Sequence, residues 1–370
     1  MRRPSEESAI MGAMTEQIPD VVARVDRADL SEMRDVDIDD VYVQMDWVLR
    51  QRATPMDLYH RWEKQNWSTQ DLDFSADAVE WKSMVGVFEG FRIELQRSFT
   101  LFFVGEQAVT DTLAPLVHAA PDEPARIFLS TQLVDEARHA VFFSRFFDEV
   151  IGIPGGLSAA LAVVRDRTVG AFREIFDRDL VNATEAVRKD PSDYGAWVEG
   201  ITVYHLIIEG MLALTGQKFL LGILRELGIL RGFYSGFTAV ARDESRHVNF
   251  GVRALMEAGV RDRALLDRVA DATFRLLEPA CWTVAAPDRK YAISPEESPE
   301  NLRINPYEIR EFSLHSLTKR LRVVGLPDDT CDEIKKRGTE YYDAAWTEYE
   351  RIHGEDHPAR FFERLEPAAS

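Results

Sequence analysis

The sequence Asp-Glu-Ala-Arg-His at residues 135–139 recurs almost unchanged as Asp-Glu-Ser-Arg-His at residues 243–247. Each copy places a glutamate and a histidine three residues apart. On an α-helix, positions i and i+3 lie on the same face about one turn apart. Each copy therefore offers one carboxylate and one imidazole to a single metal ion. A lone Glu-x-x-His pair is more often a solvated ion pair, so the prediction depends on what the rest of the chain supplies.

Two further glutamates stand alone in strongly apolar segments. Glu106 lies within Phe-Phe-Val-Gly-Glu-Gln-Ala-Val at residues 102–109, and Glu209 lies within His-Leu-Ile-Ile-Glu-Gly-Met-Leu at residues 205–212. A buried carboxylate is costly unless it is paired or ligated. Helical bundles hold two metal ions with one glutamate from each of two helices and a Glu-x-x-His pair from each of two others. The sequence therefore predicts a dinuclear metal site with six ligands: Glu106, Glu136, His139, Glu209, Glu244 and His247.

The aspartate that opens each copy, Asp135 or Asp243, has a predicted role next to the ligands. Metal-bound histidines usually donate their second ring N–H to a carboxylate, which fixes the orientation of the ring. The alternative is ordinary ion pairing with Arg138 and Arg246 on the flank of the helix. Oxygen and nitrogen ligands without thiolates suit iron or manganese, and the pattern does not distinguish the two metals.

Helical periodicity dominates the chain from about residue 81 onwards. Strand signals are almost absent, because no Asn-Gly hairpin or bounded alternating run occurs. We therefore predict an all-α fold. Proline, glycine and aspartate interruptions divide the sequence into these helical regions: 81–120, 122–150, 157–189, 190–228, 230–258, 261–280, 307–323 and 328–352.

We expect three parts along the chain. Residues 1–45 are polar and acidic and are predicted to form an N-terminal arm, mobile or peripheral. Residues 46–284 are predicted to form the helical bundle that carries the metal site. Residues 285–370 begin with four prolines in 22 residues, which predicts an irregular crossing segment followed by C-terminal helices.

Composition restricts the classes of partner. The net charge is −19, which disfavours a nucleic-acid backbone or an anionic membrane surface. The two cysteines are too few for a disulfide framework or a zinc ribbon. No apolar run reaches the length expected of a membrane-spanning segment, and the first 21 residues lack the apolar core of a signal peptide. A cytoplasmic protein is the default expectation.

The spacing of the six ligands resembles the ferritin-like superfamily, and specifically its ribonucleotide reductase small-subunit branch. The stretch Ala-Arg-Asp-Glu-Ser-Arg-His at residues 241–247 is especially similar to that branch. The resemblance covers roughly residues 60–280. It implies a ferritin-like helical bundle of the small-subunit type, a dinuclear metal site that reacts with dioxygen, and a homodimer.

Three positions favour one subgroup of that branch. Phe143 occupies the position of the radical-bearing tyrosine of the classical reductase subunits, although a manganese/iron subclass of those subunits also has phenylalanine there. Val109 and Tyr204 stand where the ribonucleotide reductase small-subunit-like ligand-binding oxidases form an ether cross-link between valine and tyrosine. By this resemblance the chain binds a long-chain fatty acid or similar apolar ligand against a mixed manganese/iron centre, with an Fe/Fe centre as the alternative.

The resemblance also assigns roles to individual residues. Manganese is expected at Glu106, Glu136 and His139, and iron at Glu209, Glu244 and His247, with carboxylates bridging. Asp243 and Trp67 match the positions of the electron relay in the reductase subunit. Six apolar residues are expected to line the ligand chamber: Phe102, Phe103, Phe142, Phe143, Met211 and Leu212.

Two other functions stay open from the sequence. The first is a radical-generating small subunit that serves a separate ribonucleotide reductase catalytic subunit. The C-terminal residues 360–367 lack a convincing version of the acidic, tyrosine-containing tail by which such subunits dock. The second is a ferritin-type bundle that binds metal without an organic substrate, although a cage-forming ferritin is normally a much shorter chain.

Overall fold

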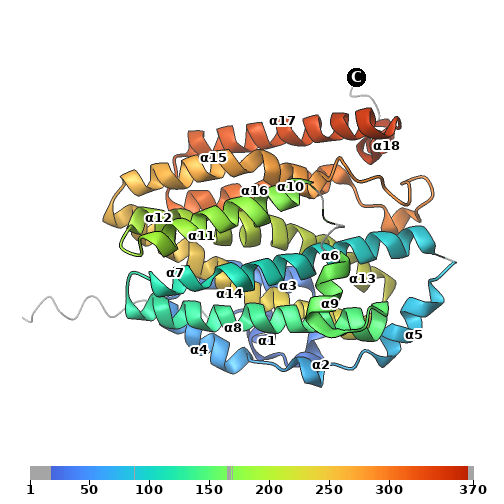
Figure 1. Ribbon diagram of the computed structural model, residues 1–370, viewed down its shortest axis with the longest axis horizontal. Coiled ribbons are helices and arrows are strands. Elements are labelled where there is room, and N and C mark those ends of the chain that lie inside the picture. The colour runs from blue at the N-terminus through green and yellow to red at the C-terminus, as the bar shows by residue number, and fades with distance from the viewer. Residues whose placement is uncertain (1–17, 87, 165–167, 169, 366–370) are drawn as a thin grey trace, which may run out of the picture.

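The computed structural model describes residues 18–86, 88–164, 168 and 170–365. Its regular elements are helices, and these residues contain no strand, which confirms the predicted all-α class. The long helices lie side by side along the long axis of the molecule (Figure 1). Four helical rods carry the predicted ligands: α6 (Glu89–Thr112), α8 (Glu123–Phe146), the continuous rod of α12, η6 and α13 (Tyr194–Leu227), and α14 (Arg231–Arg261).

Further helices surround these four rods. On the N-terminal side they are α1 (Asp20–Arg27), α2 (Leu30–Met33), α3 (Ile38–Arg50), α4 (Pro55–Gln65), η2 (Thr69–Asp71), α5 (Ser75–Ser83) and α7 (Ala114–His118). Between α8 and α12 they are η3 (Phe147–Ile151), α9 (Gly156–Val164), α10 (Gly170–Arg173), η5 (Glu174–Asp179) and α11 (Leu180–Lys189). After α14 they are α15 (Ala264–Ala285), η7 (Glu300–Leu302), α16 (Pro306–Val324), α17 (Asp328–His353) and α18 (Pro358–Leu365).

Local sequence signals determine where the ligand-bearing helices begin. Asp122 caps α8 by accepting a hydrogen bond from the backbone N–H of Ala125 at 2.9 Å, and Pro124 occupies the first turn. Asp193 caps α12 in the same way. Gly228 ends α13 with a φ of 65°, a left-handed conformation that suits glycine, and the chain then enters α14.

The segment η6 (Thr202–Ala213) is a π-helix within the central rod. A π-helix forms hydrogen bonds from i to i+5, and such turns occur frequently at functional sites. Residues five apart therefore lie about one turn apart on the same side of the helix, whereas on an α-helix they point in different directions. Tyr204 and Glu209 are five residues apart, so the π-helix places both side chains on one face.

The rod Tyr194–Leu227 is long and apolar enough to cross a membrane by length and composition. In its most apolar window, 61% of the residues are buried inside the protein. The helix packs against α14, α15 and α16 through η6. Its apolar character is thus accounted for by burial in the fold.

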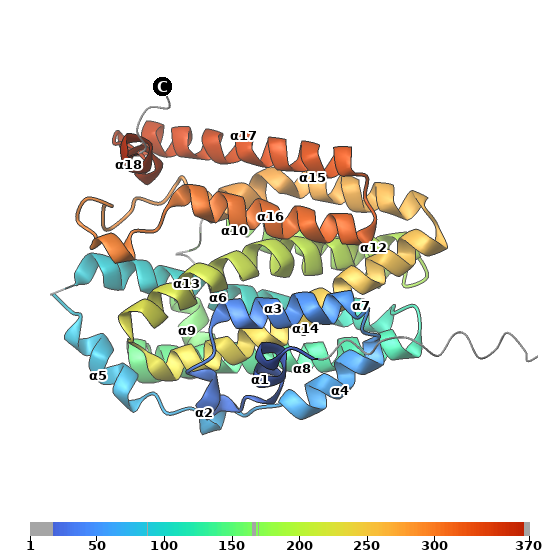
Figure 2. The same cartoon turned by 180° about the vertical axis from the view of Figure 1, so that it is seen from behind.

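The described part of the predicted N-terminal arm packs on the bundle, as in the peripheral alternative. Residues 1–17 lie outside the described residues, but α1 to α3 pack on the bundle and α3 contacts α14. The buried apolar side chains of this part include Val22, Val25, Met33, Val36, Ile38 and Val41. Helices α1, α2 and α4 lie at the edge of the molecule opposite to α17, and α3 lies nearer the middle, beside α14 (Figures 1 and 2). The acidic composition concealed this apolar stripe, since the charged residues occupy the other faces of the same short helices.

The first predicted helix, 81–120, is also interrupted in the structure. Helix α5 ends at Ser83, Gly86 adopts a φ of 74°, and α6 then begins at Glu89. Gly86 provides the left-handed turn that breaks the helix. Pro115 lies in the first turn of the separate helix α7. The ligand-bearing part of the prediction is unaffected, because Glu106 lies within α6.

Candidate metal centre

The six predicted ligands converge inside the bundle, and none is more than 8% exposed. Their donor atoms form two groups, each with its atoms within 4.8 Å of one another. One group comprises Glu106, Glu136, His139 and Glu244, and the other comprises Glu136, Glu209, Glu244 and His247. Glu136 and Glu244 belong to both groups, so each can bridge two ions.

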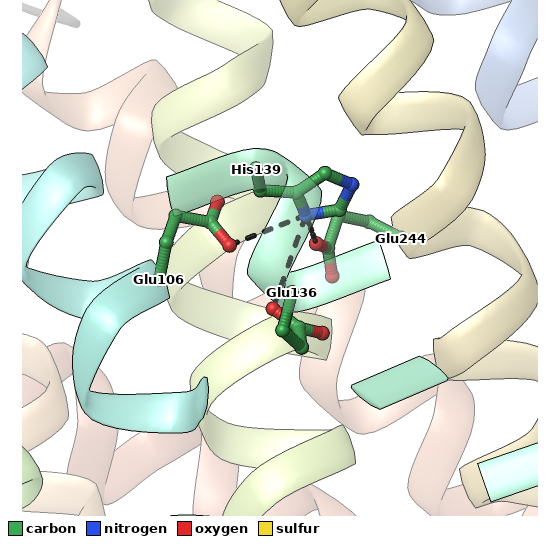
Figure 3. Close-up of side chains that lie close together, drawn as sticks. All are labelled: Glu106, Glu136, His139 and Glu244. Carbon is green, nitrogen blue, oxygen red and sulfur yellow. Dashed lines mark hydrogen bonds and ion pairs between the residues drawn. The ribbon is translucent and has the colours of Figure 1, made fainter. Parts of the chain in front are cut away.

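The first group surrounds the Nδ1 atom of His139 (Figure 3). This nitrogen lies 3.2 Å from Glu106 Oε2, 3.2 Å from Glu244 Oε1 and 3.8 Å from Glu136 Oε2. Figure 3 shows the three carboxylates reaching the imidazole from different helices. Four donors directed at one point match the requirement of a divalent ion for oxygen and nitrogen ligands.

The second group surrounds the Nδ1 atom of His247. This nitrogen lies 3.2 Å from Glu136 Oε1, 3.2 Å from Glu209 Oε1 and 3.4 Å from Glu244 Oε2. The two oxygens of Glu136 and of Glu244 thus face different histidines. The other oxygen of Glu209, Oε2, is buried and accepts no hydrogen bond. A buried carboxylate oxygen without a donor fits a metal ligand, because a bound cation would supply the missing interaction.

The two aspartates contact the histidines in a crossed arrangement. Nε2 of His139, in the first copy of the repeat, lies 3.2 Å from Oδ2 of Asp243 in the second copy. Nε2 of His247 lies 3.1 Å from Oδ2 of Asp135. Each aspartate is therefore placed to orient the ring that belongs to the other half of the site. This crossing was not part of the sequence prediction.

The two arginines of the repeat link these aspartates. Nη2 of Arg246 donates to Asp243 Oδ1 at 2.6 Å and to Asp135 Oδ2 at 3.1 Å. Arg138 Nη2 donates to the same two carboxylates from the other side. The aspartates therefore also form the ion pairs with Arg138 and Arg246 that the alternative interpretation predicted. These pairs do not lie on a solvated flank, because Asp135 and Asp243 are fully buried and link α8 to α14.

Trp67, which was predicted to be part of an electron relay, contacts this network. Its Nε1–H donates to Oδ2 of Asp243 at 2.8 Å, and its ring stacks on His139 with centroids 6.5 Å apart. Trp62 was not predicted to belong to the site, but its Nε1–H donates to Oδ1 of Asp135 at 2.8 Å. The sequence did contain a signal for this contact, because Trp62 is a second tryptophan only five residues before Trp67.

Tyr204 reaches the same centre from η6. Its hydroxyl donates to Glu136 Oε1 and accepts from Nε2 of Gln132 at 2.9 Å. Gln132 also donates to Glu209 Oε1 at 3.1 Å. Burial, with the neighbouring glutamates, holds the pKa of Tyr204 well above its usual range. Gln132 was missed in the sequence, although it lies four residues before Glu136 on the same face of α8.

A cavity of about 750 Å³ joins the glutamates to an apolar chamber. Val109 and Tyr204 both line it, together with all four glutamates of the site. Of the six apolar residues predicted to line the chamber, Phe102 and Leu212 do so. The other four lie outside the lining and are fully buried in the core: Phe103, Phe142, Phe143 and Met211. Helical periodicity does not distinguish a residue that faces the cavity from one that faces a neighbouring helix.

In the metal-free site, burial and neighbouring charges raise the pKa values of several ligands and so favour their protonated forms. Burial raises the pKa of Glu106 to about 8, although His139 opposes the shift. Burial and the Glu244 carboxylate raise the pKa of Glu209 well above its usual range. Burial lowers the pKa of His139, but Glu106 and other acceptors outweigh it, so that this pKa is raised well above its usual range. A metal ion would replace these protons.

Metal affinity is therefore expected to rise with pH. The metal needs ionised Glu106, and the metal-free protein holds this carboxyl protonated below about pH 8. The apparent affinity for Fe²⁺ should increase as the pH approaches 8, with protons released on binding. Calorimetric titration in buffers of different ionisation enthalpy counts those protons. Glu106→Gln should release fewer protons than the wild type, and equal release by both proteins would contradict this explanation.

Comparisons with known proteins agree with this geometry. The family model of the ribonucleotide reductase small chain matches residues 45–272, which is more than half of the chain. A variant of R2-like ligand-binding oxidase with an anaerobically reconstituted Mn/Fe cofactor has a similar structure, with a TM-score of 0.56 and 21% identity over 80% of this chain and 92% of that chain.

Two more solved structures share the fold. R2-like ligand-binding oxidase with an aerobically reconstituted metal cofactor after photoconversion has a TM-score of 0.56 and 22% identity, over 80% of this chain and 92% of that one. Another variant of R2-like ligand-binding oxidase with an anaerobically reconstituted Mn/Fe cofactor has a TM-score of 0.60 and 24% identity, over 73% of this chain and 92% of that one. The family match, the shared helical fold and the paired ligand groups together show that the chain belongs to the ribonucleotide reductase small-chain family of metal-dependent oxidoreductases.

Proposed function

We propose that the protein is a dioxygen-activating oxidase with a dinuclear Mn/Fe or Fe/Fe centre that binds a long-chain fatty-acid-like ligand. The observation that carries this proposal is the cavity, which is lined both by the four glutamates of the site and by apolar side chains. Its size falls within the usual range for small-molecule sites, about 300–1,000 Å³. We also propose that the protein acts as a cytoplasmic homodimer.

The walls of the cavity suit an aliphatic chain. Besides the glutamates and Tyr204, the lining includes apolar residues from α6, α13 and the segment after α15; among these are Leu101, Phe102, Phe219, Leu220, Ile223 and Ile293. An apolar ligand gains about 0.8 kcal/mol for each methylene removed from water. Such a ligand would also exclude water from the centre and suppress side reactions.

The residues of the site have separate roles in the proposed reaction. Glu136 and Glu244 would bridge the two ions, and the remaining ligands would hold one ion each. Bound in a reduced state, the metal pair would supply electrons to dioxygen and orient the substrate. Asp243 and Trp67, which are joined by a hydrogen bond, would serve as an electron relay.

Phe143 disfavours a classical subunit that stores a tyrosyl radical at this position, and it does not separate an oxidase from the manganese/iron subclass of reductase subunits. Its ring packs among aromatic rings of Phe103 and Phe237, with centroid distances of 6.2 and 5.6 Å. The side chain has no hydroxyl to carry a radical at this position. The large apolar cavity favours an organic ligand over the storage of iron alone.

Formation of an ether between Val109 and Tyr204 provides a direct test. The reaction removes one hydrogen from the valine side chain and the phenolic hydrogen of the tyrosine, and dioxygen accepts both. Intact-protein mass spectrometry after aerobic loading with manganese and iron should show a mass about two units below the calculated value. Tyr204→Phe should retain the metals but show no deficit, because it lacks the attacking oxygen.

Tyr234→Phe is the matched control for this experiment. Tyr234 is also buried, but its hydroxyl donates to the backbone oxygen of Val36 at 2.8 Å and lies outside the cavity lining. This variant should retain the mass deficit. A deficit that persists in Tyr204→Phe would refute the assignment of that tyrosine.

A further inference from the structure

Two tryptophans on one short segment make equivalent contacts with the paired aspartates. Trp62 lies in the last turn of α4, and Trp67 follows the end of that helix. Each donates its Nε1–H to an aspartate at 2.8 Å, and each aspartate contacts a histidine ligand. Two chains of contacts therefore run from indole through carboxylate to imidazole: Trp62–Asp135–His247 and Trp67–Asp243–His139.

The outer ends of these chains have different surroundings. Trp67 is only 8% exposed, and the guanidinium of Arg138 lies 5.0 Å from the centre of its ring. A cation at this distance opposes the development of positive charge on the indole. Trp62 is half-buried, and its ring stacks on that of Tyr59 with centroids 6.0 Å apart. Tyr59 is half-buried too, and its hydroxyl donates to the exposed Glu63 at 3.1 Å.

We propose that Tyr59 and Trp62 form the outward end of an electron-entry path that continues through Asp135 to the His247 side of the metal centre. The donor would be a one-electron reductant, such as a reduced flavin or iron–sulfur protein, that docks over α4. This proposal depends on the proposed function, because it requires a redox-active metal pair. It differs from the predicted relay, which ends at the buried Trp67.

The electron balance of an oxidase explains why such a path is needed. Reduction of dioxygen to two waters takes four electrons and four protons. Oxidation of one organic substrate supplies two electrons and two protons, and water supplies the remaining two protons. The other two electrons leave the metal pair and must be returned from outside. In each of two transfers the donor loses one electron, the oxidised centre gains one, and the indole of Trp62 ends unchanged.

The depth of the site separates the metal ligands from a donor at the protein surface. The metal ligands are between 0 and 8% exposed, so a donor protein at the surface cannot contact them. Trp62 is hydrogen-bonded to the network on one side and stacked against a half-buried tyrosine on the other. If Trp62 had only a structural role, its hydrogen bond to Asp135 would be sufficient. Replacing Trp62 would then not change the rate of electron transfer to the metal centre.

The test is the rate at which reduced methyl viologen reduces the air-oxidised, metal-loaded protein in a stopped-flow instrument. Trp62→Phe is expected to slow this reduction about tenfold, and to slow it more than Trp67→Phe does. Trp282→Phe is the matched control, since Trp282 is also half-buried but lies on α15 and outside the cavity lining. The Trp282→Phe variant should be reduced at the wild-type rate. Elemental analysis should find the same metal content in all four proteins.

A second measurement needs no metal. In the metal-free protein, acrylamide should quench a smaller fraction of tryptophan fluorescence after Trp62→Phe, because one of the two half-buried indoles, Trp62 and Trp282, has been removed. The proposal is overturned if Trp62→Phe is reduced within about twofold of the wild-type rate, if Trp67→Phe is slowed more, or if quenching is unchanged. A wild-type protein that takes up no electrons would instead refute the proposed function.

Discussion

Glu244→Ala is expected to remove both metal ions, whereas Glu106→Ala is expected to remove one. Glu244 directs one oxygen to each histidine, with Oε1 3.2 Å from His139 Nδ1 and Oε2 3.4 Å from His247 Nδ1. It therefore belongs to both ligand groups, and Glu106 belongs to one. Changes to residues that merely orient a ligand typically cost about 10–100-fold in metal affinity. Loss of a bridging ligand should cost at least as much at each of the two positions.

Elemental analysis after loading and gel filtration measures this outcome directly. We expect about two ions per chain in the wild type, about one in Glu106→Ala and fewer than one in Glu244→Ala. Glu209→Ala is the counterpart of Glu106→Ala on the other side and should also retain about one ion. Full occupancy in Glu244→Ala would show that this carboxylate does not bridge. Thermal unfolding of the metal-free variants would establish that the differences come from metal binding rather than from misfolding.

The ligands themselves could be predicted because their pattern is local. The spacing within each Glu-x-x-His pair depends only on helical geometry, and an isolated glutamate in an apolar helix already indicates a buried partner. The number of helices that meet at the site followed from the same reasoning. In the structure, Glu106 lies on α6, Glu209 lies on η6, and the two copies of the repeat lie on α8 and α14.

The contacts between the two copies could not be predicted, because they depend on how α8 and α14 face each other. Sequence alone suggested that Asp135 and Asp243 assist the histidines, but the structure pairs each aspartate with the histidine of the other copy. The π-helix is a second example. Helical periodicity was recognised over residues 202–213, but the change from i+4 to i+5 hydrogen bonding left no clear signal in the amino acids.

The N-terminal segment and the cavity show a third limit. The average polarity of residues 18–45 concealed a narrow apolar stripe that packs on the bundle, since a short helix needs few apolar residues to bury one face. The aromatic residues near the site were recognised as a group. Only the packing decides that Phe102 lines the cavity while Phe103 fills the core beside it.

Arg246→Met is expected to lower the free energy of unfolding of the metal-free protein by about 3–5 kcal/mol, the usual cost of removing one partner from a buried ion pair. The guanidinium is 1% exposed and donates to Asp135, Asp243 and the side chain of Gln65. Methionine fills a similar volume but leaves the two carboxylates with only Arg138 and the imidazoles of His139 and His247 as partners. Denaturant unfolding without metal measures the change, since bound ions would add their own stabilisation.

Arg253→Met is the matched control on the same helix. Arg253 pairs with Glu257 at the surface, where its side chain is 26% exposed, and surface pairs contribute about 0–1 kcal/mol. The contrast tests whether the repeat stabilises the fold as well as holding the ligands. If Arg246→Met cost no more than Arg253→Met, Arg138 and the two histidines would suffice to balance the two aspartates. A large cost would mean that the residue between glutamate and histidine in the second copy holds α8 and α14 together before any metal binds.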